Sequence, residues 1–358
     1  MHGPTGKLLD SLVAGGTFTP ELFLSLFENR HTSARALRQK AAEIRQREFG
    51  KGIFIRGLIE ISNCCRNDCL YCGIRYGNDT VERYRLTDAQ ILNSCRRGYA
   101  LGFRTFVLQG GEDEAFHPER ISRLIRTIKT AHPDCALTLS LGEYPKEVYA
   151  EWKRSGADRY LLRHESANPT HYAFLHGAPR DVRNGRTAAY RQQCLYDLKS
   201  LGYQTGAGFM VGTPKQTPAH LAEDMRFLED LQPHMIGIGP FIPHPHTPLG
   251  LYPDTPPETE RLELTLFLLS LIRIRFKRVL LPATTALATI RPDGRQLGIL
   301  HGANVVMPNL TPEAEKGRYE IYRNKKCTGA ENAAALDELN RTVSAIGYHI
   351  DKGIGNYV

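Results

Sequence analysis

The sequence predicts an α/β fold, a (β/α)8 barrel of the TIM type with helices before it and an extension after it. Short apolar runs alternate with helical patterns along most of the chain. These runs are apolar on both faces, as parallel strands are when helices cover the sheet. No Gly-rich linker divides the 358 residues. Barrels of this length fold as one domain, although length alone predicts about two.

The predicted elements follow one another in the order that a barrel requires. The strands are residues 53–62, 105–109, 136–141, 158–162, 205–211, 235–240, 279–283 and 304–306. The helices are residues 88–101, 118–132, 144–155, 187–201, 220–231 and 257–276, and a last helix at 296–301 has only one or two turns. We assign residues 1–50 to an N-terminal helical extension, 51–310 to the barrel, and 311–358 to a partly helical extension that closes the barrel.

The composition is that of a globular protein outside the membrane. Hydrophobic residues make up 41% and charged residues 23% of the chain, which argues against disorder. The most apolar window, residues 264–272, is far shorter than the 20 or so residues of a membrane span. The N-terminal residues lack the long apolar core of a signal peptide. We therefore expect a cytoplasmic protein with no membrane partner.

The chain has a net charge of +8, and its basic residues are scattered. Their highest local density lies in a predicted N-terminal helix, at Arg35, Arg38, Lys40, Arg45 and Arg47. We expect a solvated helix face, and the alternative is a docking face for an acidic partner or an anionic substrate. Because no aromatic residues are interleaved with this charge, we expect no nucleic-acid partner.

The most specific motif is a C-x3-C-x2-C run just after the first strand, made by Cys65, Cys69 and Cys72. Three thiolates on one loop can ligate three corners of a cuboidal iron–sulfur cluster and leave the fourth iron open for another ligand. The alternatives are a zinc site completed by Cys64 or by a distant histidine, and reduced thiols without a ligand. We interpret Cys64 as a buried neighbour of the motif.

With Tyr71 before the last cysteine, this motif resembles the signature of the radical S-adenosylmethionine (SAM) superfamily. The resemblance implies a 4Fe–4S cluster whose open iron is chelated by SAM. It also implies that one electron from the reduced cluster cleaves SAM to a 5′-deoxyadenosyl radical. In such enzymes the cofactor supplies the difficult chemistry, while the protein orients it and excludes water.

Further stretches are similar to the HydE family, the radical SAM maturases of FeFe-hydrogenase. They are residues 59–73, 108–113, 138–145, 158–169, 202–208, 236–245 and 281–285, and the similarity runs from about Gly6 to about Cys327. The resemblance implies a radical step on a small anionic, cysteine-bearing iron complex. The maturase HydG would supply this complex, and the scaffold protein HydF would receive the product.

Two other functions stay open at this point. The first is a radical SAM enzyme that acts on another small amino acid or thiol, as methylornithine synthase does. The second is a zinc-stabilised module that binds protein or nucleic acid. Reductive cleavage of SAM after anaerobic reconstitution would separate the second from both radical SAM functions.

The resemblance to HydE also implies roles for individual residues. Tyr71, Gly110, Gly111, Glu112, Glu165, Arg191 and Met210 would bind SAM, and Thr138, Arg163, Thr284, Thr285, Met307, Tyr319 and Tyr322 would bind an anionic substrate. Glycines allow close approach of the backbone, and a guanidinium suits a carboxylate. The alternatives are a solvated Arg191, a structural ion pair of Glu165 with a nearby arginine, an ion pair of Arg163 with Glu165 or Glu143, and a Met210 that only fills the core.

Two other features are expected to hold no metal. His244 and His246 lie in an extended Pro-His-Pro-His segment and are expected to cap the loop of the sixth strand. Some HydE proteins have a C-terminal cysteine trio for a second cluster. Here only Cys327 matches it, and residues 328–358 contain no cysteine. We therefore predict one 4Fe–4S cluster and no second cluster.

Overall fold

The computed structural model describes residues 12–13, 18–177, 187–326 and 332–357. Its main sheet is parallel and has the strand order β2-β3-β4-β5-β6-β8. The strands are β2 (Gly57–Ser62), β3 (Thr105–Gly110), β4 (Ala136–Ser140), β5 (Arg159–Leu161), β6 (Gln204–Ala207) and β8 (Met235–Ile236). Neighbours in the sheet are consecutive predicted strands of the chain, so the predicted parallel β-then-α order is confirmed for these six.

Beyond β8, single bridges join the main sheet to the described segments that follow it. These bridges are Met235 with Leu280, Pro282 with Val305, and Leu58 with Asn309, which leads back to β2. The predicted strand at residues 279–283 is therefore no regular strand in the structure. Pro282 explains part of this difference, because proline has no N–H to donate to a ladder.

Three predicted strands are each divided in two. Residues 53–62 form β1 (Gly52–Ile55) and β2, and β1 pairs instead with β10 (Val305–Val306) and β11 (His349–Asp351). Residues 205–211 form β6 and β7 (Met210–Val211), and residues 235–240 form β8 and β9 (Gly239–Pro240). Gly208 explains the break after β6. Its φ is +151°, and a Cβ there would lie 1.9 Å from the carbonyl oxygen of Gly237.

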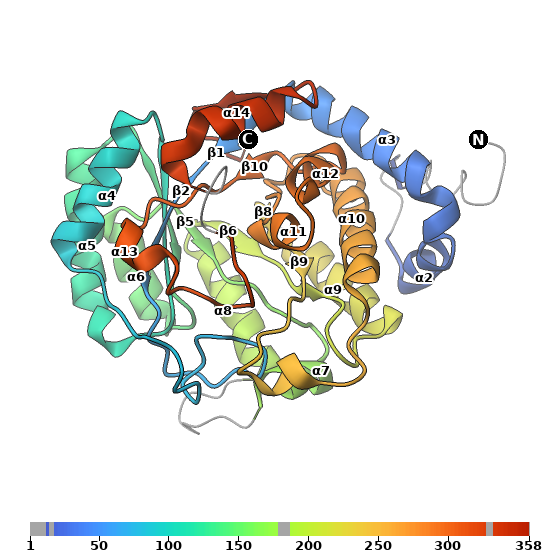
Figure 1. Cartoon of the computed structure of the whole chain (residues 1–358), viewed down its shortest axis with the longest axis horizontal. Helices are drawn as coiled ribbons and strands as arrows, with labels where there is room; N and C mark the ends of the chain where they lie inside the picture. The colour runs from blue at the N-terminus through green and yellow to red at the C-terminus, as the bar shows by residue number, and fades with distance from the viewer. Residues whose placement is uncertain (1–11, 14–17, 178–186, 327–331, 358) are drawn as a thin grey trace.

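Helices lie on both sides of the strands (Figure 1). The six long predicted helices are present as α4 (Asp88–Ala100), α5 (Pro118–Ala131), α6 (Lys146–Ser155), α8 (Ala188–Ser200), α9 (Pro218–Leu231) and α10 (Glu258–Arg275). The short last helix is α12 (Gly294–Leu300), whereas α7 (Pro169–His176) and α11 (Thr285–Ile290) were not predicted. The N-terminal helices are α2 (Pro20–Glu28) and α3 (Arg30–Phe49), and α13 (Glu313–Lys316) and α14 (Leu336–Ser344) lie near the C-terminus.

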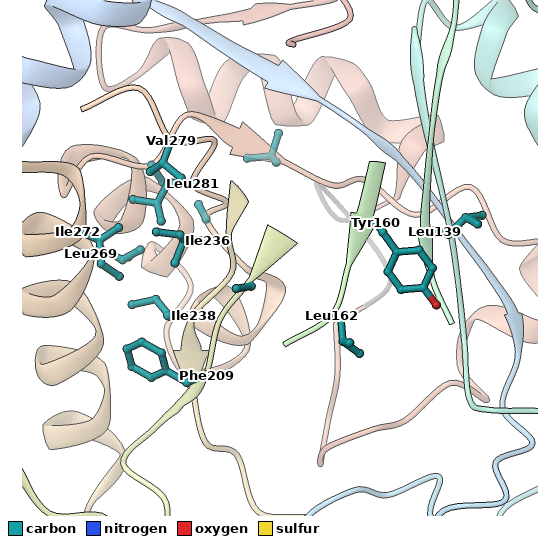
Figure 2. Packing of buried hydrophobic residues seen from close by; sticks show 14 of the residues in the cluster. Leu139, Tyr160, Leu162, Phe209, Ile236, Ile238, Leu269, Ile272, Val279 and Leu281 are labelled. Atoms are coloured by element: carbon teal, nitrogen blue, oxygen red, sulfur yellow. The ribbon is translucent and has the colours of Figure 1, made fainter. Parts of the chain in front are cut away.

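The hydrophobic core fills the space between the strands and their covering helices (Figure 2). Leu269 and Ile272 of α10 are fully buried in the same cluster as Ile236 and Leu281. None of the described helices has both the length and the hydropathy needed to cross a membrane.

The prediction that the basic residues of α3 form a solvated face is wrong for one of them. Arg35, Arg38 and Arg47 are exposed, but Arg45 is fully buried. Its guanidinium donates to the carbonyl oxygens of Gly50 and Gly52, where the chain leaves α3 for β1. Arg45 therefore fixes this junction and offers no charge to a partner.

Candidate functional site

A cavity of about 330 Å³ lies at the carboxyl ends of the strands, lined mainly by the segments that follow β2, β3, β5 and β8. It brings together residues that are far apart in the sequence and includes all but one of the predicted site residues. These residues are Cys65, Cys69, Cys72, Tyr71, Gly110, Gly111, Glu112, Arg163, Glu165, Arg191, Met210, Thr284, Thr285, Met307, Tyr319 and Tyr322. Thr138, in the middle of β4, is buried and is not in this lining.

The cysteine loop, residues 63–73, follows β2 directly and is tied to three other parts of the fold. The N–H of Arg66 donates to the carbonyl oxygen of Glu112 at 2.9 Å. The N–H of Leu70 donates to the carbonyl oxygen of Leu175 near the end of α7, also at 2.9 Å. The N–H of Gly73 donates to the carbonyl oxygen of Ile321 in the C-terminal segment at 2.9 Å. Cys65, Cys69 and Cys72 are reduced thiols that all reach the cavity wall. The predicted grouping of the three thiols around one cavity is therefore present.

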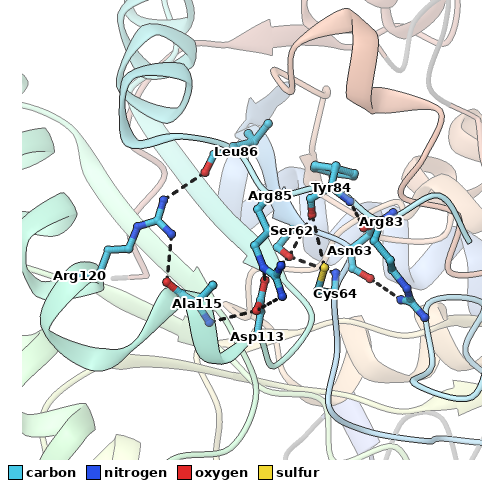
Figure 3. Close-up of polar contacts among 10 residues, drawn as sticks. All are labelled: Ser62, Asn63, Cys64, Arg83, Tyr84, Arg85, Leu86, Asp113, Ala115 and Arg120. Atoms are coloured by element: carbon cyan, nitrogen blue, oxygen red, sulfur yellow. Dashed lines mark hydrogen bonds and ion pairs between the residues drawn. The ribbon is translucent and has the colours of Figure 1, made fainter.

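Polar contacts anchor the base of this loop to the neighbouring strand end (Figure 3). Asp113 accepts from the Ser62 hydroxyl at 2.6 Å and from Arg85 Nε at 2.7 Å. Cys64 belongs to this anchor, since its N–H donates to Ser62 Oγ and its Sγ lies 3.8 Å from the carbonyl oxygen of Tyr84. It is half-buried and does not line the cavity.

The donor set of the loop, three thiols at one cavity, fits a metal centre that is bound by thiolates. Burial raises the pKa of the Cys72 thiol to about 12, and nearby Cys65 adds to the shift. A thiolate at this position therefore needs a compensating positive charge, which a bound metal supplies. Among the described residues, no three His, Cys, Asp or Glu side chains converge on a single-ion site.

The loop after β3 packs directly against the cysteine loop. A Cβ on Gly111 would lie 2.2 Å from the carbonyl oxygen of Cys64, so only glycine fits there without movement. The buried carboxylate of Glu112 accepts from the N–H of Glu143 at 3.0 Å and from Arg66 Nε at 3.2 Å. Together these contacts fix a carboxylate beside the three cysteines.

Two arginines of the cavity form ion pairs. Arg163 Nη2 lies 3.2 Å from Glu165 Oε2, which is the structural ion pair considered as an alternative for both residues. Arg191 Nε lies 3.0 Å from Glu143 Oε1, and Arg191 is buried in α8, so the alternative of a solvated Arg191 is wrong. Each carboxylate holds its guanidinium at the cavity wall.

Several buried polar atoms on the predicted substrate side have no hydrogen-bond partner among the described residues. They are Thr138 Oγ1, Thr284 Oγ1 and Arg163 Nε. A buried hydroxyl without a partner costs about 1–3 kcal/mol. Arg163 and Thr284 line the cavity, and unpartnered polar atoms at a cavity wall indicate a polar ligand that satisfies them when it binds.

Residues of the C-terminal segment contribute another part of the cavity wall. Tyr319 and Tyr322 line it as predicted, and the Tyr319 hydroxyl accepts from Gln109 Nε2 at 3.4 Å. Sequence analysis missed Lys325, which also lines the cavity and pairs with buried Glu60 of β2 at 2.6 Å. A glutamate inside an apolar strand signals that a cation must lie nearby, but not which one.

His244 and His246 lie at a second, separate pocket, and their ring centroids are 5.7 Å apart. His244 is buried, with Nε2 3.8 Å from Glu320 Oε2. Its Nδ1 accepts from the N–H of His246, which is consistent with the expected cap of this loop. Cys327, the position that matches the second-cluster trio, lies outside the described residues.

The amino-acid sequence is similar to one protein-family model and to proteins of known function. Residues 59–228 match the model of the radical SAM superfamily. The chain is 44% identical over 344 residues to the [FeFe] hydrogenase maturase subunit HydE of Thermotoga maritima, covering 96% of this chain and 95% of the relative. It is 26% identical over 277 residues to a 3-methylornithine synthase of Methanosarcina barkeri, covering 77% and 74% of the two chains.

Solved structures share the fold at lower sequence identity. A methylornithine synthase structure matches with a TM-score of 0.78 and 21% identity, covering 96% of this chain and 97% of that one. The FeFe-hydrogenase maturase HydG from Carboxydothermus hydrogenoformans matches with a TM-score of 0.79 and 16% identity, covering 97% and 80%. At these identities the structural matches establish the fold alone.

Proposed function

Because the chain belongs to the HydE family and is a radical SAM enzyme of FeFe-hydrogenase maturation, we propose that the cavity at the strand ends serves both cofactor and substrate. Membership of the superfamily implies a 4Fe–4S cluster and SAM. The proposal adds that there is one cluster and that the substrate is a small, anionic, cysteine-bearing iron complex. The observation that carries it is that the three cysteines and all the predicted SAM and substrate residues except Thr138 line the same cavity.

Cys65, Cys69 and Cys72 would hold the cluster, each as a thiolate. When bound, the cluster and SAM supply a 5′-deoxyadenosyl radical. Gly110, Gly111 and Glu112 would receive the amino group of SAM, because the glycine backbone leaves room and the carboxylate is fixed in place. Tyr71 and Met210 would contact the remainder of SAM.

Two charged residues would bind the polar ends of SAM. Arg191 would hold its carboxylate, since a guanidinium offers paired donors to two oxygens. Glu165 would accept hydrogen bonds from the ribose hydroxyls. In the structure both side chains lie at the cavity wall and are held there by their ion pairs.

The substrate would bind on the side of the unpartnered polar atoms. Thr138, Arg163, Thr284 and Thr285 would hold its anionic group, with Met307, Tyr319 and Tyr322 around it. The orphaned hydroxyls and Arg163 Nε support this assignment, because an anion with several acceptor atoms would satisfy them. Tyr319, Tyr322 and Lys325 of the C-terminal segment line the cavity and would help to keep water from the reacting groups.

At the level of the whole molecule, we propose that the single bridges close the strands into a barrel of eight, comprising residues 51–310. Residues 1–50 and 311–358 would be its two extensions. HydG would supply the iron complex, and HydF would receive the product.

The test compares Cys69→Ala with Cys64→Ala, a matched control one residue before the motif. After anaerobic reconstitution, Cys69→Ala should contain little iron and sulfide, form no 5′-deoxyadenosine with SAM and a reductant, and fail to support hydrogenase maturation. Cys64→Ala should keep all three properties near wild type, with about four irons per chain. Iron and sulfide analysis, product chromatography and a hydrogen-evolution assay give these readings.

Two outcomes would contradict the proposal. Normal maturation by Cys69→Ala would exclude the cluster assignment. Normal SAM cleavage by the wild type without any support of hydrogenase maturation would favour action on another small amino acid, as in the methylornithine synthases that share the fold.

A further inference from the structure

A buried histidine–aspartate pair lies directly behind the predicted ribose ligand Glu165. His164 and Asp224 both have a side-chain exposure of 0%, and His164 Nε2 lies 3.3 Å from Asp224 Oδ1. Asp224 belongs to α9, whereas His164 follows β5. Neither residue lines the cavity, so the pair can affect a ligand only through its neighbours.

The contacts around the pair indicate which ring nitrogen of His164 carries the hydrogen and which backbone groups the pair holds. The N–H of Gly208 donates to His164 Nδ1 at 3.3 Å, so Nδ1 is the unprotonated nitrogen and Nε2 carries the hydrogen that faces Asp224. Asp224 Oδ1 also accepts from the N–H of Ala167 at 2.6 Å. One carboxylate oxygen thus contacts the residue before Glu165 and the residue two positions after it.

Glu165 itself has a backbone conformation that requires such support. Its φ is +62°, a region that non-glycine residues rarely adopt and that costs about 1–3 kcal/mol. Such strain persists only where the surroundings impose it. Here the N–H of Glu165 donates to the carbonyl oxygen of Gly208 at 3.1 Å, next to the contact between Gly208 and His164.

Packing holds the imidazole in the same place. The His164 ring lies 5.6 Å from the ring of Phe209 and 4.8 Å from that of Phe227, measured between centroids. The ring is therefore held by two aromatic contacts, by the hydrogen bond at Nδ1 and by the 3.3 Å contact of Nε2 with Asp224. Through this side chain, α9 can hold the turn at residues 164–167 in one position.

We propose that His164 and Asp224 are positioning residues that hold Glu165 in the orientation needed to bind the ribose hydroxyls of SAM. This inference rests on the proposed function, because it takes SAM as the ligand of the cavity. It adds two residues, outside the cavity, that set the affinity for the nucleoside part of SAM.

The experiment measures the Kd of SAM for the reconstituted holoenzyme. His164→Phe keeps an aromatic ring and loses both polar contacts, so we expect about tenfold weaker binding at unchanged iron content. Asp224→Asn is the conservative control, because its amide oxygen can still accept from both N–H groups, and its Kd should stay within about twofold of wild type. His164→Asn, which keeps only the acceptor for Gly208, provides a second disruptive variant should His164→Phe fold poorly.

Two further measurements distinguish a positioning role of His164 from a general loss of structure. Binding of 5′-deoxyadenosine should weaken together with SAM, whereas binding of methionine, which has no ribose, should stay unchanged. In a Glu165→Gln background, His164→Phe should cause little additional loss, because the residue through which it acts is already altered. The KM for SAM should rise more than kcat falls.

An unchanged Kd of SAM in both His164 variants would overturn this inference and leave the proposed function intact. Equal weakening of methionine and 5′-deoxyadenosine would also overturn it, because the effect would then not pass through Glu165. A wild-type holoenzyme that does not bind SAM at all would instead contradict the proposed function.

Discussion

Thr138 and Thr284 each bury a hydroxyl that has no hydrogen-bond partner among the described residues. In the free protein such a group lowers stability, and in a complex with an anion it contributes affinity. The same atoms therefore increase the affinity for the ligand and lower the stability of the ligand-free protein. This conflict is typical of functional sites, where local stability is given up for activity.

Thr138→Val should separate the two effects. The folded protein loses no hydrogen bond, so we expect an unfolding free energy equal to wild type or higher by about 1 kcal/mol. Maturation should fall roughly tenfold or more, because a hydrogen bond to an anion contributes about 1.5–3 kcal/mol. Urea denaturation and a hydrogenase maturation assay measure the two quantities.

Ser122→Ala is the matched control. Ser122 Oγ is also buried without a partner in the described part of the chain, but Ser122 lies on the covering helix α5 and is not one of the predicted site residues. Its replacement should leave maturation unchanged. Clear destabilisation by Thr138→Val with normal maturation would show that the Thr138 hydroxyl is structural.

At the scale of elements, the close contact between the β3 loop and the cysteine loop depends on one glycine. Gly111→Ala would place a Cβ 2.2 Å from the carbonyl oxygen of Cys64 and 2.7 Å from the Cβ of Cys65. We expect the cysteine loop to move, with iron content and SAM affinity each reduced several-fold. Gly317→Ala is the control, since a Cβ added at Gly317 would meet no described atom within 4 Å. Equal cluster content in both variants would contradict this prediction.

Helix α7 contains a titratable group that links stability to pH. Burial lowers the pKa of His171 to about 4, and the nearby His220 adds to this shift. Above about pH 6.5 the histidine is neutral in both states and its contribution is fully present. As the pH falls toward 4 the unfolded chain takes up the proton first, so stability is lost in this window.

We expect the contribution of His171 to lower the unfolding free energy at about pH 5 by roughly 2 kcal/mol relative to its value at about pH 7.5. Urea denaturation of the reduced protein at both pH values measures the difference. In His171→Gln the difference should shrink by that amount. An equal pH dependence in wild type and variant would contradict the pKa of His171.

The sequence predicts most elements but not where strands break. The long helices α4, α5, α6 and α9 are predicted because their apolar faces repeat with helical spacing. After Thr205 the run at 205–211 has no polar side chain, so its pattern cannot reveal that Gly208 turns the chain against Gly237. Nor can local pattern predict β11, because its partner β1 lies at the other end of the sequence.

At the scale of the molecule, the C-terminal segment closes the amino-terminal end of the sheet around one arginine. Arg159 of β5 is fully buried and donates to the carbonyl oxygens of Ile354 and Gly355, at 3.1 Å each, and to Asn356 Oδ1 at 2.7 Å. Removal of these acceptors leaves a buried guanidinium with fewer partners, which is strongly destabilising.

Deletion of residues 354–358 should lower the unfolding free energy by at least about 3 kcal/mol, because several hydrogen bonds to a charged group are lost. Asn356→Ala removes one acceptor and should cost about half as much or less. Urea denaturation of the three proteins measures both differences. Unchanged stability of the truncated protein would mean that water replaces the lost acceptors.

The candidate site could be predicted from the sequence where a short motif or a family resemblance marks it. The cysteine run and the polar segments after the strands are of this kind, and the structure brings them to one cavity. Lys325 could not be predicted, because its partner Glu60 is distant in sequence and no local pattern joins them. The same holds for the pair of His164 and Asp224, which only the packing of α9 brings together.

The ties of the cysteine loop have a consequence for biosynthesis. The loop hydrogen-bonds to Leu175 and to Ile321, and Ile321 lies far after the loop in the sequence. A nascent polypeptide on the ribosome has made the three thiols long before it makes Ile321. The loop therefore cannot reach its final conformation until Ile321 has been synthesised, and metal loading into the finished site follows the synthesis of this segment.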